Sequence, residues 1–543
     1  MAFSMLTLAT HLSLSQSQSS GERRAVSSRQ LLESSTFWRQ QGATILGEAL
    51  NDQSGSLVSL SADGLTLATG APYNDGAGTS SGHARVYSLS TSAWAQLGAD
   101  IDGQAQIDRS GWAVALSADG RTLAVGAPYN DDAGTSSGHV RVYTWTLSDW
   151  EQLGEDIIGE TAGDESGWSI SLSSDGLTLA VGAPYNNGNG ELSGHARVFK
   201  YIAPAWQQLG DDIDGKAALD ESGWSVALSA DGSVLAVGSP YSNSGGRSSG
   251  NARVFKWTSS AWQQLGDDIN GEVAGDESGW SVSLSGDGLT LAVGAPYNSG
   301  GGFSSGHARV FKWTLSAWEQ VGDGINGEAA NDQCGRSIAL SRDGTLLALG
   351  APYNDGTGEN SGHTRVFMWT SRSWEQIGDD IDGEEAGDES GWSVALSEDG
   401  NILAVGAPYG NATGTVRVFT GPASPPSPPL PPPSPPPPPL PPPPPPSPPP
   451  ASSTVLVVGV VGSGVAVVVA VLVLVYAINR QCGRHGKISV VVPTSFSSMR
   501  FSAALTSAWR ASACRASAVW RGSSARGSTF RAADEPGGNA HKV

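Results

Sequence analysis

Apolar and polar residues alternate with a period of two along most of the chain, a pattern typical of β-strands that bury one face. In residues 167–173 (GWSISLS), apolar side chains take alternate positions and serines fill most of the others. An Asp-Gly pair follows, and then a second apolar run, 177–184 (LTLAVGAP). Because Asp-Gly favours the positive φ angles of tight hairpin turns, the two runs are predicted to pair. Further strands are predicted at 194–199 and from Trp206, without any helical period between them.

The four-strand pattern recurs every 56 residues, and its clearest marker is a Gly-Ala/Ser-Pro-Tyr turn. This turn begins at Gly70, Gly126, Gly182, Gly238, Gly294, Gly350 and Gly406. Seven four-stranded units of equal length predict an all-β fold, a seven-bladed β-propeller over residues 37–420. The seventh unit has only three strands before Thr420. Residues 37–42 (FWRQQG) match the missing fourth strand, so this N-terminal strand is predicted to close the ring.

Three motifs of each unit resemble the FG-GAP repeat, which builds the propeller head of integrin α chains. In the last unit they are Gly391-Trp392, residues 405–408 (VGAP) and a following Gly-x-x-Arg-Val-Phe. The resemblance covers residues 38–420 and implies a ligand-binding propeller without naming the ligand; a closer variant family consists mostly of proteins without assigned functions. Calcium-binding FG-GAP units carry several Asp and Asn in the hairpin before the GAP strand. Here the hairpin 117–120 (SADG) has one carboxylate, so that calcium site is not expected.

Long loops follow the second and fourth strands of each unit, and the meander places them on one face of the ring. Functional residues concentrate on loops held by a rigid scaffold. The candidate ligand-binding residues on this face are Tyr129, Asn130, Asp131, Asp132, Arg247, Phe303, Tyr353, Asn354 and Asp355. No cofactor is required, although one acidic loop offers secondary candidates for calcium: Asp380, Asp382, Glu384 and Asp388. Because Asn and Asp also serve turn geometry, residues that recur in every unit, such as Asp164, are expected to fix the loops.

Histidine recurs at the start of the third strand, which suggests a ring of metal ligands as an alternative. These residues are His83, His139, His195, His307 and His363, with Asn251 in one unit. A strand spacing of about 4.8 Å puts this position roughly 10 Å beyond the innermost strand, so neighbouring histidines are expected to lie too far apart to share an ion. A structural role is therefore expected. Cys334 replaces the serine of most other units and is expected to be a small buried substitute.

The sequence has a net charge of −21, and its basic residues are concentrated at one end. Residues 479–543 hold 10 Lys/Arg and 2 Asp/Glu, so the rest of the chain is strongly acidic. Such a domain repels nucleic acid, which is not an expected partner. No Ser-His-Asp order, zinc-ligand spacing or phosphate-binding loop is present, so the chain is not expected to be an enzyme.

Three segments flank the propeller. Residues 1–36 hold a short apolar stretch that we interpret as an export signal or an N-terminal segment. Residues 421–451 hold 22 Pro and are expected to form an extended polyproline stalk, which resembles the hydroxyproline-rich stalks of plant and green-algal matrix glycoproteins. Residues 455–478 form an uncharged apolar run long enough to cross a bilayer. Basic residues follow it, which places the disordered tail 479–543 in the cytoplasm and the ring outside, as in a single-pass type I protein of the plasma membrane.

Modification and pairing of the chain are suggested at three places. Asn411 begins the only Asn-x-Ser/Thr sequon and is expected to be glycosylated. Cys482 follows the apolar run and is a candidate for lipidation, with an unmodified thiol as the alternative. Small residues four apart within the run, such as Gly459 and Ser463, favour a weak helix-mediated dimer.

The combined features indicate a cell-surface recognition or adhesion receptor whose propeller binds an extracellular protein or glycan. A second hypothesis is a structural wall or matrix protein whose propeller packs into the coat. A third is a carbohydrate-active enzyme built on the propeller. Binding of glycans or proteins by the isolated ring separates the first hypothesis from the second, and polysaccharide turnover supports the third.

Overall fold

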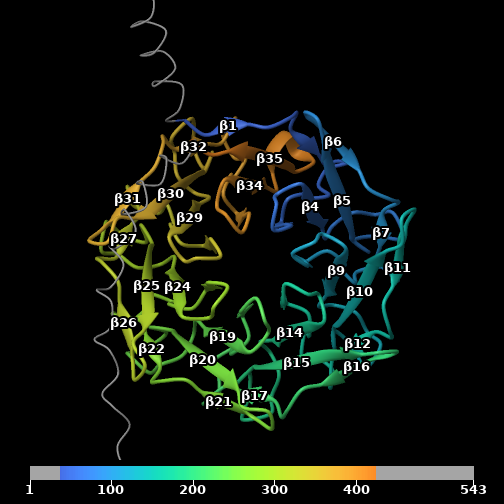
Figure 1. Cartoon of the computed structure of the whole chain (residues 1–543), viewed down its shortest axis with the longest axis horizontal. Helices are drawn as coiled ribbons and strands as arrows, with labels where there is room; N and C mark the ends of the chain where they lie inside the picture. Colours follow the sequence, from blue (N-terminus) through green and yellow to red (C-terminus); the bar gives the residue numbers. More distant parts are fainter. Residues whose placement is uncertain (1–36, 423–543) are drawn as a thin grey trace, which may run out of the picture. The chain divides into compact units, whose positions relative to one another are not determined.

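The computed structural model describes residues 37–422, which form seven β-sheets arranged around one axis (Figure 1). The seven-bladed propeller predicted from the 56-residue repeat is therefore confirmed. The predicted N-terminal segment, nearly all of the stalk, the membrane span, the tail and Cys482 lie outside the described residues. Within residues 37–422, no helix has the length and apolar character needed to cross a membrane.

Blade 3 illustrates the strand order that the blades share. Its strands β13 (Ser169–Leu172), β14 (Thr178–Ala183), β15 (His195–Ile202) and β16 (Ala205–Gln208) pair antiparallel in sequence order, with β13 innermost. Where one fourth strand was predicted, the structure has two short ones, because β17 (Ile213–Asp214) also pairs with β15. The chain turns between β16 and β17 at a glycine with a φ of +83°, a conformation that other residues rarely adopt.

The remaining blades have the following elements. Blade 1 contains β3 (Leu57–Leu60), β4 (Thr66–Ala71), β5 (His83–Ser90), β6 (Ala93–Gln96) and β7 (Ile101–Asp102). Blade 2 contains β8 (Ala113–Leu116), β9 (Thr122–Ala127), β10 (His139–Trp145), β11 (Trp150–Gln152) and β12 (Ile157–Ile158). Blade 4 contains β18 (Ser225–Leu228), β19 (Val234–Ser239), β20 (Asn251–Trp257), β21 (Trp262–Gln264) and β22 (Ile269–Asn270).

Blade 5 contains β23 (Ser281–Leu284), β24 (Thr290–Ala295), β25 (His307–Trp313), β26 (Trp318–Gln320) and β27 (Ile325–Asn326). Blade 6 contains β28 (Ser337–Leu340), β29 (Leu346–Ala351), β30 (His363–Trp369), β31 (Trp374–Gln376) and β32 (Ile381–Asp382). Blade 7 contains β33 (Ser393–Leu396), β34 (Ile402–Ala407), the short 3₁₀ helix η1 (Gly410–Ala412), β35 (Thr415–Thr420) and two strands from the start of the ring, β1 (Arg39–Gln40) and β2 (Ile45–Leu46).

A buried arginine on the third strand links each blade to the blade before it. Arg197 is only 6% exposed, and its Nη2 donates a hydrogen bond to the carbonyl oxygen of Ile158 in blade 2 at 2.8 Å. Its guanidinium also lies 5.2 Å from the centre of the Phe199 ring. Hydrogen bonds from charged donors contribute roughly 1.5–3 kcal/mol each. Equivalent bonds are made by Arg85, Arg141, Arg253, Arg309, Arg365 and Arg417.

The hairpins between the first and second strands join the blades a second time, on the face of the short turns. One backbone N–H of each hairpin donates to a carbonyl of the next hairpin, with N···O distances of 2.7–3.0 Å. The donors are, in order, Ala62, Ala118, Ser174, Ala230, Gly286, Arg342 and Glu398, and each bonds to the residue that follows it in this series. Because Glu398 donates back to Ala62, the hydrogen bonds form a closed circuit around the axis.

The apolar core lies between blades rather than within one sheet. Leu179 of β14 is fully buried and packs in one cluster with Val140 and Val142 of blade 2. The equivalent leucine of every blade is also fully buried: Leu67, Leu123, Leu235, Leu291, Leu347 and Leu403. Each such side chain contributes about 1.5–3 kcal/mol when fully buried. Cys334 is buried in the serine position, as expected, and receives a contact of 3.6 Å from Arg365 Nη2.

The N-terminal strand closes the ring as the sequence predicted. Figure 1 shows β1, drawn in blue, beside β35, drawn in orange, and Arg39 is in register with Thr420. Trp38 Nε1 donates to the carbonyl of Ile377 in blade 6 at 3.1 Å. On the other side, Trp94 Nε1 of blade 1 donates to the carbonyl of Gln41 at 2.9 Å. Residues 38–46 therefore link blade 7 to both of its neighbours.

Removal of residues 39–46 is expected to cause aggregation or a large drop in melting temperature. The deletion exposes the edge of β35, and exposed strand edges are templates for aggregation. An equal deletion within the stalk, residues 430–437, serves as the control and is expected to leave the melting temperature unchanged. Thermal unfolding followed by circular dichroism, together with light scattering, checks both. Identical behaviour of the two deletions would contradict closure by β1 and β2.

Candidate ligand-binding site

The two long loops of each blade lie side by side on one face, as the meander predicted. The loop before β5 is hydrogen-bonded to the loop that leads into blade 2, through Arg109 N to Ser80 O at 3.2 Å and Ser110 N to Ser81 O at 2.9 Å. The same pairing of loops recurs at the following junctions through parallel bridges. These contacts form a continuous surface of loops around the axis.

Tryptophan side chains meet one another around the axis on this face. Trp112, Trp168, Trp224 and Trp280 each directly precede an innermost strand, and successive innermost strands contact one another. Neighbouring rings in this series have centroids 4.8–4.9 Å apart and interplanar angles of 46–53°. All four residues are partly buried. Partly exposed aromatic rings in close contact are suited to stacking against a ligand.

A tyrosine from the Gly-Ala/Ser-Pro-Tyr turn packs beside each tryptophan. Tyr185 meets the ring of Trp168 edge to face, with centroids 5.7 Å apart at 82°. We call this set the axial collar; it consists of Trp112, Trp168, Trp224, Trp280 and Trp392 together with Tyr73, Tyr129, Tyr185, Tyr241, Tyr297, Tyr353 and Tyr409. Two predicted site residues, Tyr129 and Tyr353, belong to it.

Two arginines add positive charge to the axial collar. Arg336 takes the tryptophan position in blade 6, and its guanidinium carbon lies 4.0 Å from the centre of the Trp392 ring and 5.1 Å from that of Trp280. Arg109 lies over Tyr129, at 4.3 Å from the ring centre. Such contacts bind the cation to the aromatic face. The collar is therefore positively charged at Arg109 and Arg336, whereas its members on the side of Trp168 and Trp224 are all aromatic.

Four carboxylates stand between the rings and carry perturbed proton affinities. They are Glu165, Glu221, Glu277 and Glu389, three residues before their tryptophans. Burial raises the pKa of each from 4.5 to about 7, and for Glu221 repulsion from Glu277 and Glu165 adds to the effect. Except in Glu221, the Oε2 atom is buried without a hydrogen-bond partner. Carboxylates perturbed by burial are concentrated at functional sites.

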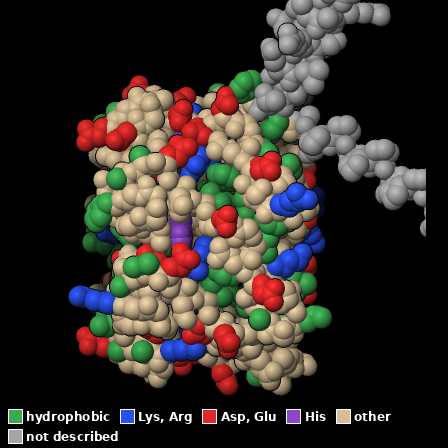
Figure 2. Space-filling view, turned by 90° about the vertical axis from the view of Figure 1, so that its left-hand side faces the viewer, with side chains coloured by type: hydrophobic (Ala, Val, Ile, Leu, Met, Phe, Trp, Pro, Cys, Tyr) green, Lys and Arg blue, Asp and Glu red, His purple; other side chains and the backbone are tan. Residues whose placement is uncertain are grey.

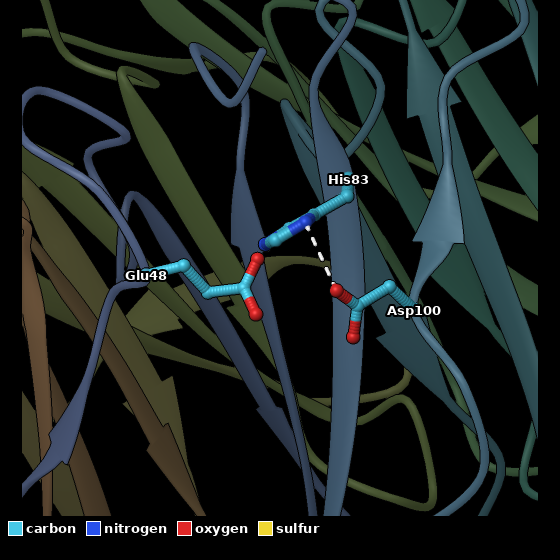
Figure 3. A group of neighbouring side chains, drawn as sticks. All are labelled: Glu48, His83 and Asp100. Atoms are coloured by element: carbon cyan, nitrogen blue, oxygen red, sulfur yellow. Dashed lines mark ion pairs between the residues drawn. The ribbon is translucent and has the colours of Figure 1, made fainter. Parts of the chain in front are cut away.

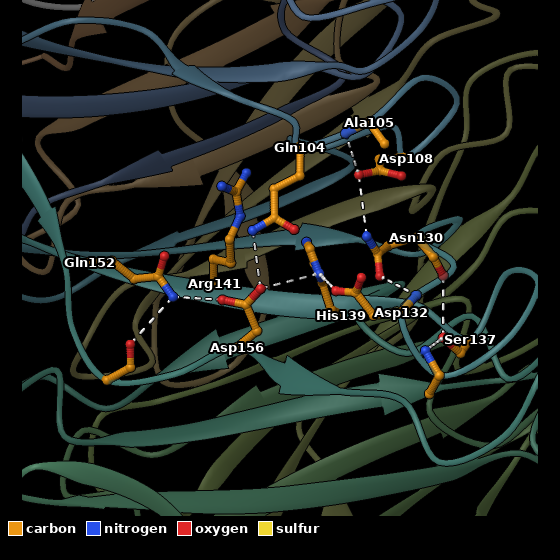
Figure 4. Close-up of polar contacts among 12 residues, drawn as sticks. Gln104, Ala105, Asp108, Asn130, Asp132, Ser137, His139, Arg141, Gln152 and Asp156 are labelled. Carbon is orange, nitrogen blue, oxygen red and sulfur yellow. Dashed lines mark hydrogen bonds and ion pairs between the residues drawn. The ribbon is translucent and has the colours of Figure 1, made fainter.

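Several predicted site residues fix the loops instead of facing a ligand. Asn130 is buried, and its Nδ2 donates to Oδ2 of Asp108 at 3.3 Å (Figure 4). Asn354 makes the same contact with Asp332 at 3.2 Å. These side chains hold one long loop against the other, so they act as structural residues.

The aspartates of these loops divide between two roles. Asp131 Oδ1 accepts a hydrogen bond from the backbone N–H of Ser136, and Asp355 Oδ1 does the same for Asn360. Asp132 instead lies beside a histidine, His139, at 3.3 Å. Only this last residue joins a cluster of possible ion ligands.

Two further candidate ligand-binding residues, Arg247 and Phe303, are exposed. Arg247 lies at an exposed position of the loop before β20, and Phe303 is 75% exposed in the loop before β25. An apolar ring this exposed is available to a partner. Asn411 of the glycosylation sequon is exposed within η1.

The four acidic candidates for calcium do not form one group. Asp388 is buried, and its Oδ2 accepts hydrogen bonds from the backbone N–H groups of Glu384 and Glu385. Asp380 lies near Glu328 and His363. Among residues 37–422, the four acids are not one of the clusters close enough to hold an ion together.

The axial collar was not identified from the sequence. Its tryptophans begin the alternating apolar pattern, so they were interpreted as strand residues of the core. The detectable signal was a Glu-x-x-Trp spacing that recurs at the end of the long loop and varies in blades 1, 2 and 6. Since identical units surround one axis, any residue at a loop end is repeated there as a ring.

Substitution of Glu221 by Gln is expected to raise the melting temperature more at pH 8 than at pH 5. The pKa of Glu221 is raised to about 7 in the folded protein, so the folded state holds this proton more tightly than the unfolded chain does. The ionised carboxylate therefore lowers stability above pH 7, and the effect fades as the pH falls toward the unfolded value. Calorimetry at both pH values tests this. Glu191→Gln, at an exposed loop position, is the control, and equal shifts for both variants would contradict the burial effect.

Comparisons with known proteins support the fold. The FG-GAP repeat family matches residues 97–143, 159–199 and 270–311. No curated protein matches the chain. Among solved structures, a protein from Bacteroides uniformis named as a putative 6-phosphogluconolactonase is 12% identical, with a TM-score of 0.43 over 60% of this chain and 85% of that one, and nothing is inferred from it. Three FG-GAP repeat matches and seven blades that follow one repeat together support an FG-GAP repeat β-propeller protein.

Proposed function

We propose that this chain is a single-pass recognition protein of the cell surface, whose propeller binds an extracellular protein or glycan through the axial collar. The collar supports this proposal most strongly, because it places partly exposed tryptophan rings, tyrosines and charged groups together on the loop face. Tryptophan, tyrosine and arginine are the residues most often found at the energetic centre of binding interfaces. The proposed role is binding and not catalysis.

The position of the collar fits recognition of an external partner. The opposite face carries the short hairpins, which are joined by the closed circuit of backbone hydrogen bonds. The loop face adds the exposed side chains of Arg247 and Phe303, which differ from their counterparts in other blades. The proposed stalk, 421–451, and membrane span, 455–478, would hold the ring away from the cell.

A carbohydrate-active enzyme is the second candidate, and the carboxylates favour it. A pKa near 7 suits a group that gives and takes protons at neutral pH. Glu165 has such a pKa and lies among aromatic rings that suit sugar faces. Release of reducing sugars from algal or plant polysaccharides by the full-length chain distinguishes this candidate from simple binding.

Substitution of Trp224 by Ala is expected to weaken binding of the ligand by at least tenfold. Ligands are first found by screening the full-length chain against glycan and protein arrays. A central aromatic residue of an interface contributes about 2 kcal/mol or more, which corresponds to roughly 30-fold in Kd. Leu315→Ser is the matched control, because Leu315 is 93% exposed in a short turn of the opposite face. Unchanged affinity in Trp224→Ala, with the melting temperature retained, would contradict a ligand site at the axial collar.

A further inference from the structure

Side chains from two blades converge at the junctions between blades. At the junction of blades 2 and 3, Glu160 follows β12 of one blade, whereas His195 begins β15 of the next and Asp212 precedes its β17. One ligand atom from each residue lies within 4.8 Å of the others. Similar groups form at three further junctions: Glu48, His83 and Asp100; Asp132, His139 and Asp156; Glu328, His363 and Asp380. Figure 3 shows the first of these, in which His83 lies between the two carboxylates.

The histidine of each group is buried and has at least one ring nitrogen without a hydrogen-bond partner: Nδ1 in His83 and His195, and Nε2 in His83, His139 and His363. His195 is 1% exposed, and its Nδ1 has no hydrogen-bond partner although it faces Asp212. In His83 both ring nitrogens are buried without a partner. An imidazole nitrogen without a hydrogen-bond partner is free to bind a metal ion.

The spacing of the groups suits an ion better than direct hydrogen bonds. His195 Nδ1 lies 3.8 Å from Oδ2 of Asp212, and His83 Nδ1 lies 3.7 Å from Oδ2 of Asp100. Both distances exceed a hydrogen bond. Ligands about 2.1 Å from a tetrahedral ion lie roughly 3.4 Å apart, so small adjustments would bring these atoms into coordination.

The neighbouring arginine leaves the carboxylate partly free. Arg197 Nη1 lies 3.5 Å from Oε1 of Glu160, a long contact that involves one of the two oxygens. The same guanidinium already donates to the carbonyl of Ile158 at 2.8 Å. Figure 2 shows a histidine on the side of the ring with carboxylates and basic side chains around it. At the junction of blades 2 and 3, the side chains of Asp212 and Glu160 are 30% and 41% exposed, so ions can reach this group from solvent.

Differences between the repeats preserve a second carboxylate ligand in blade 2. The glutamate position is Gln104 there, which cannot provide a carboxylate. In the same junction Asp132 appears at a position that is Gly or Ser in other blades, and its Oδ2 lies 3.3 Å from Nδ1 of His139 (Figure 4). Asp156 completes the group, with Oδ2 3.8 Å from the same nitrogen.

A fixed cation takes the place of the glutamate ligand at the junction of blades 3 and 4. Lys216 occupies the glutamate position, and its Nζ lies 2.7 Å from both carboxylate oxygens of Asp268. Asn251 replaces the histidine in this junction. This junction therefore lacks the glutamate and histidine ligands and keeps only the aspartate, and a built-in ammonium pairs with Asp268 here.

The junction of blades 4 and 5 lacks one ligand. Gly324 stands in the aspartate position, while Glu272 and His307 remain. A cavity of about 540 Å³ lies there, lined by these three residues among others. With only two ligands, this junction is not expected to hold an ion by protein groups alone.

We propose that four junctions of the propeller each bind one divalent cation of the zinc class through one histidine and two carboxylates. Mixed nitrogen and oxygen ligands suit such ions, whereas calcium prefers oxygen alone. Each ion has ligands from two adjacent blades, except at Asp132, His139 and Asp156, which all belong to blade 2. Bound ions therefore stabilise most of these junctions, because binding to the folded state alone raises its stability.

Zinc alone is the probe, with the full-length chain first stripped by a chelator and then dialysed against Zn²⁺. Zinc content by mass spectrometry and calorimetric titration is expected to show at least four ions per chain and an increase in melting temperature. The variant E160K/H195N gives the junction of blades 2 and 3 the same residue types as the junction of blades 3 and 4, where Lys216, Asn251 and Asp268 stand. The fold already accommodates this combination. It is expected to lose one ion per chain without change of the melting temperature in chelator.

The reverse substitution keeps the proposal falsifiable if the first variant folds poorly. K216E/N251H introduces the missing ligands beside Asp268 and is expected to bind one ion more than the unaltered chain. The result is the difference in zinc content between each variant and the unaltered chain. Zinc bound by thiols outside the propeller is the same in all three proteins and cancels in this difference. Zinc content that does not rise in K216E/N251H, or fewer than four ions in the unaltered chain, would overturn the assignment.

Discussion

The interface between one blade and the next is the constraint on which this molecule depends. A single blade has two apolar faces, and residues such as Leu179 complete their burial against side chains of the preceding blade. The buried arginines cross the same interface and place a charged donor on a carbonyl of the neighbour. Burying that charge is favourable only because its hydrogen bonds and aromatic partner are in place. Each blade therefore needs a neighbour on both of its faces, and the closed ring provides all seven interfaces.

Sequence reasoning identified the interfaces only indirectly. The Asp-Gly turns, the period of two and the constant repeat length were sufficient for the blade, the blade number and closure by residues 37–42. The division of the outer strand into β16 and β17 was missed, because two paired residues leave no periodic pattern. Whether a ring of Trp168 and its equivalents is partly exposed depends on how blades tilt toward the axis, which is a property of the assembled ring.

In the candidate site, too, contacts within one loop could be predicted from the sequence, whereas contacts between blades could not. Asn130 and Asp131 were selected as polar loop residues, and their turn-forming chemistry, which the sequence also suggested, accounts for their contacts. The carboxylate of Glu221 gains its unusual proton affinity only when Glu277 and Glu165 are brought beside it from neighbouring blades. No spacing along the chain encodes that proximity. Repeat proteins form rings of like groups, and single-unit substitutions such as Arg336 make them asymmetric.

Closure by β1 also has a kinetic consequence. Gln41 and Thr420 are hydrogen-bonded across 379 positions of sequence, so the final sheet forms only after nearly the whole ring has been synthesised. Closing so long a loop costs more conformational entropy than forming a local hairpin, and folding that depends on distant contacts is slow. Six completed blades must wait with an open edge at each end. The lysine-poor, apolar strands of this protein make that interval its most vulnerable stage, when assistance from chaperones during synthesis has the greatest effect.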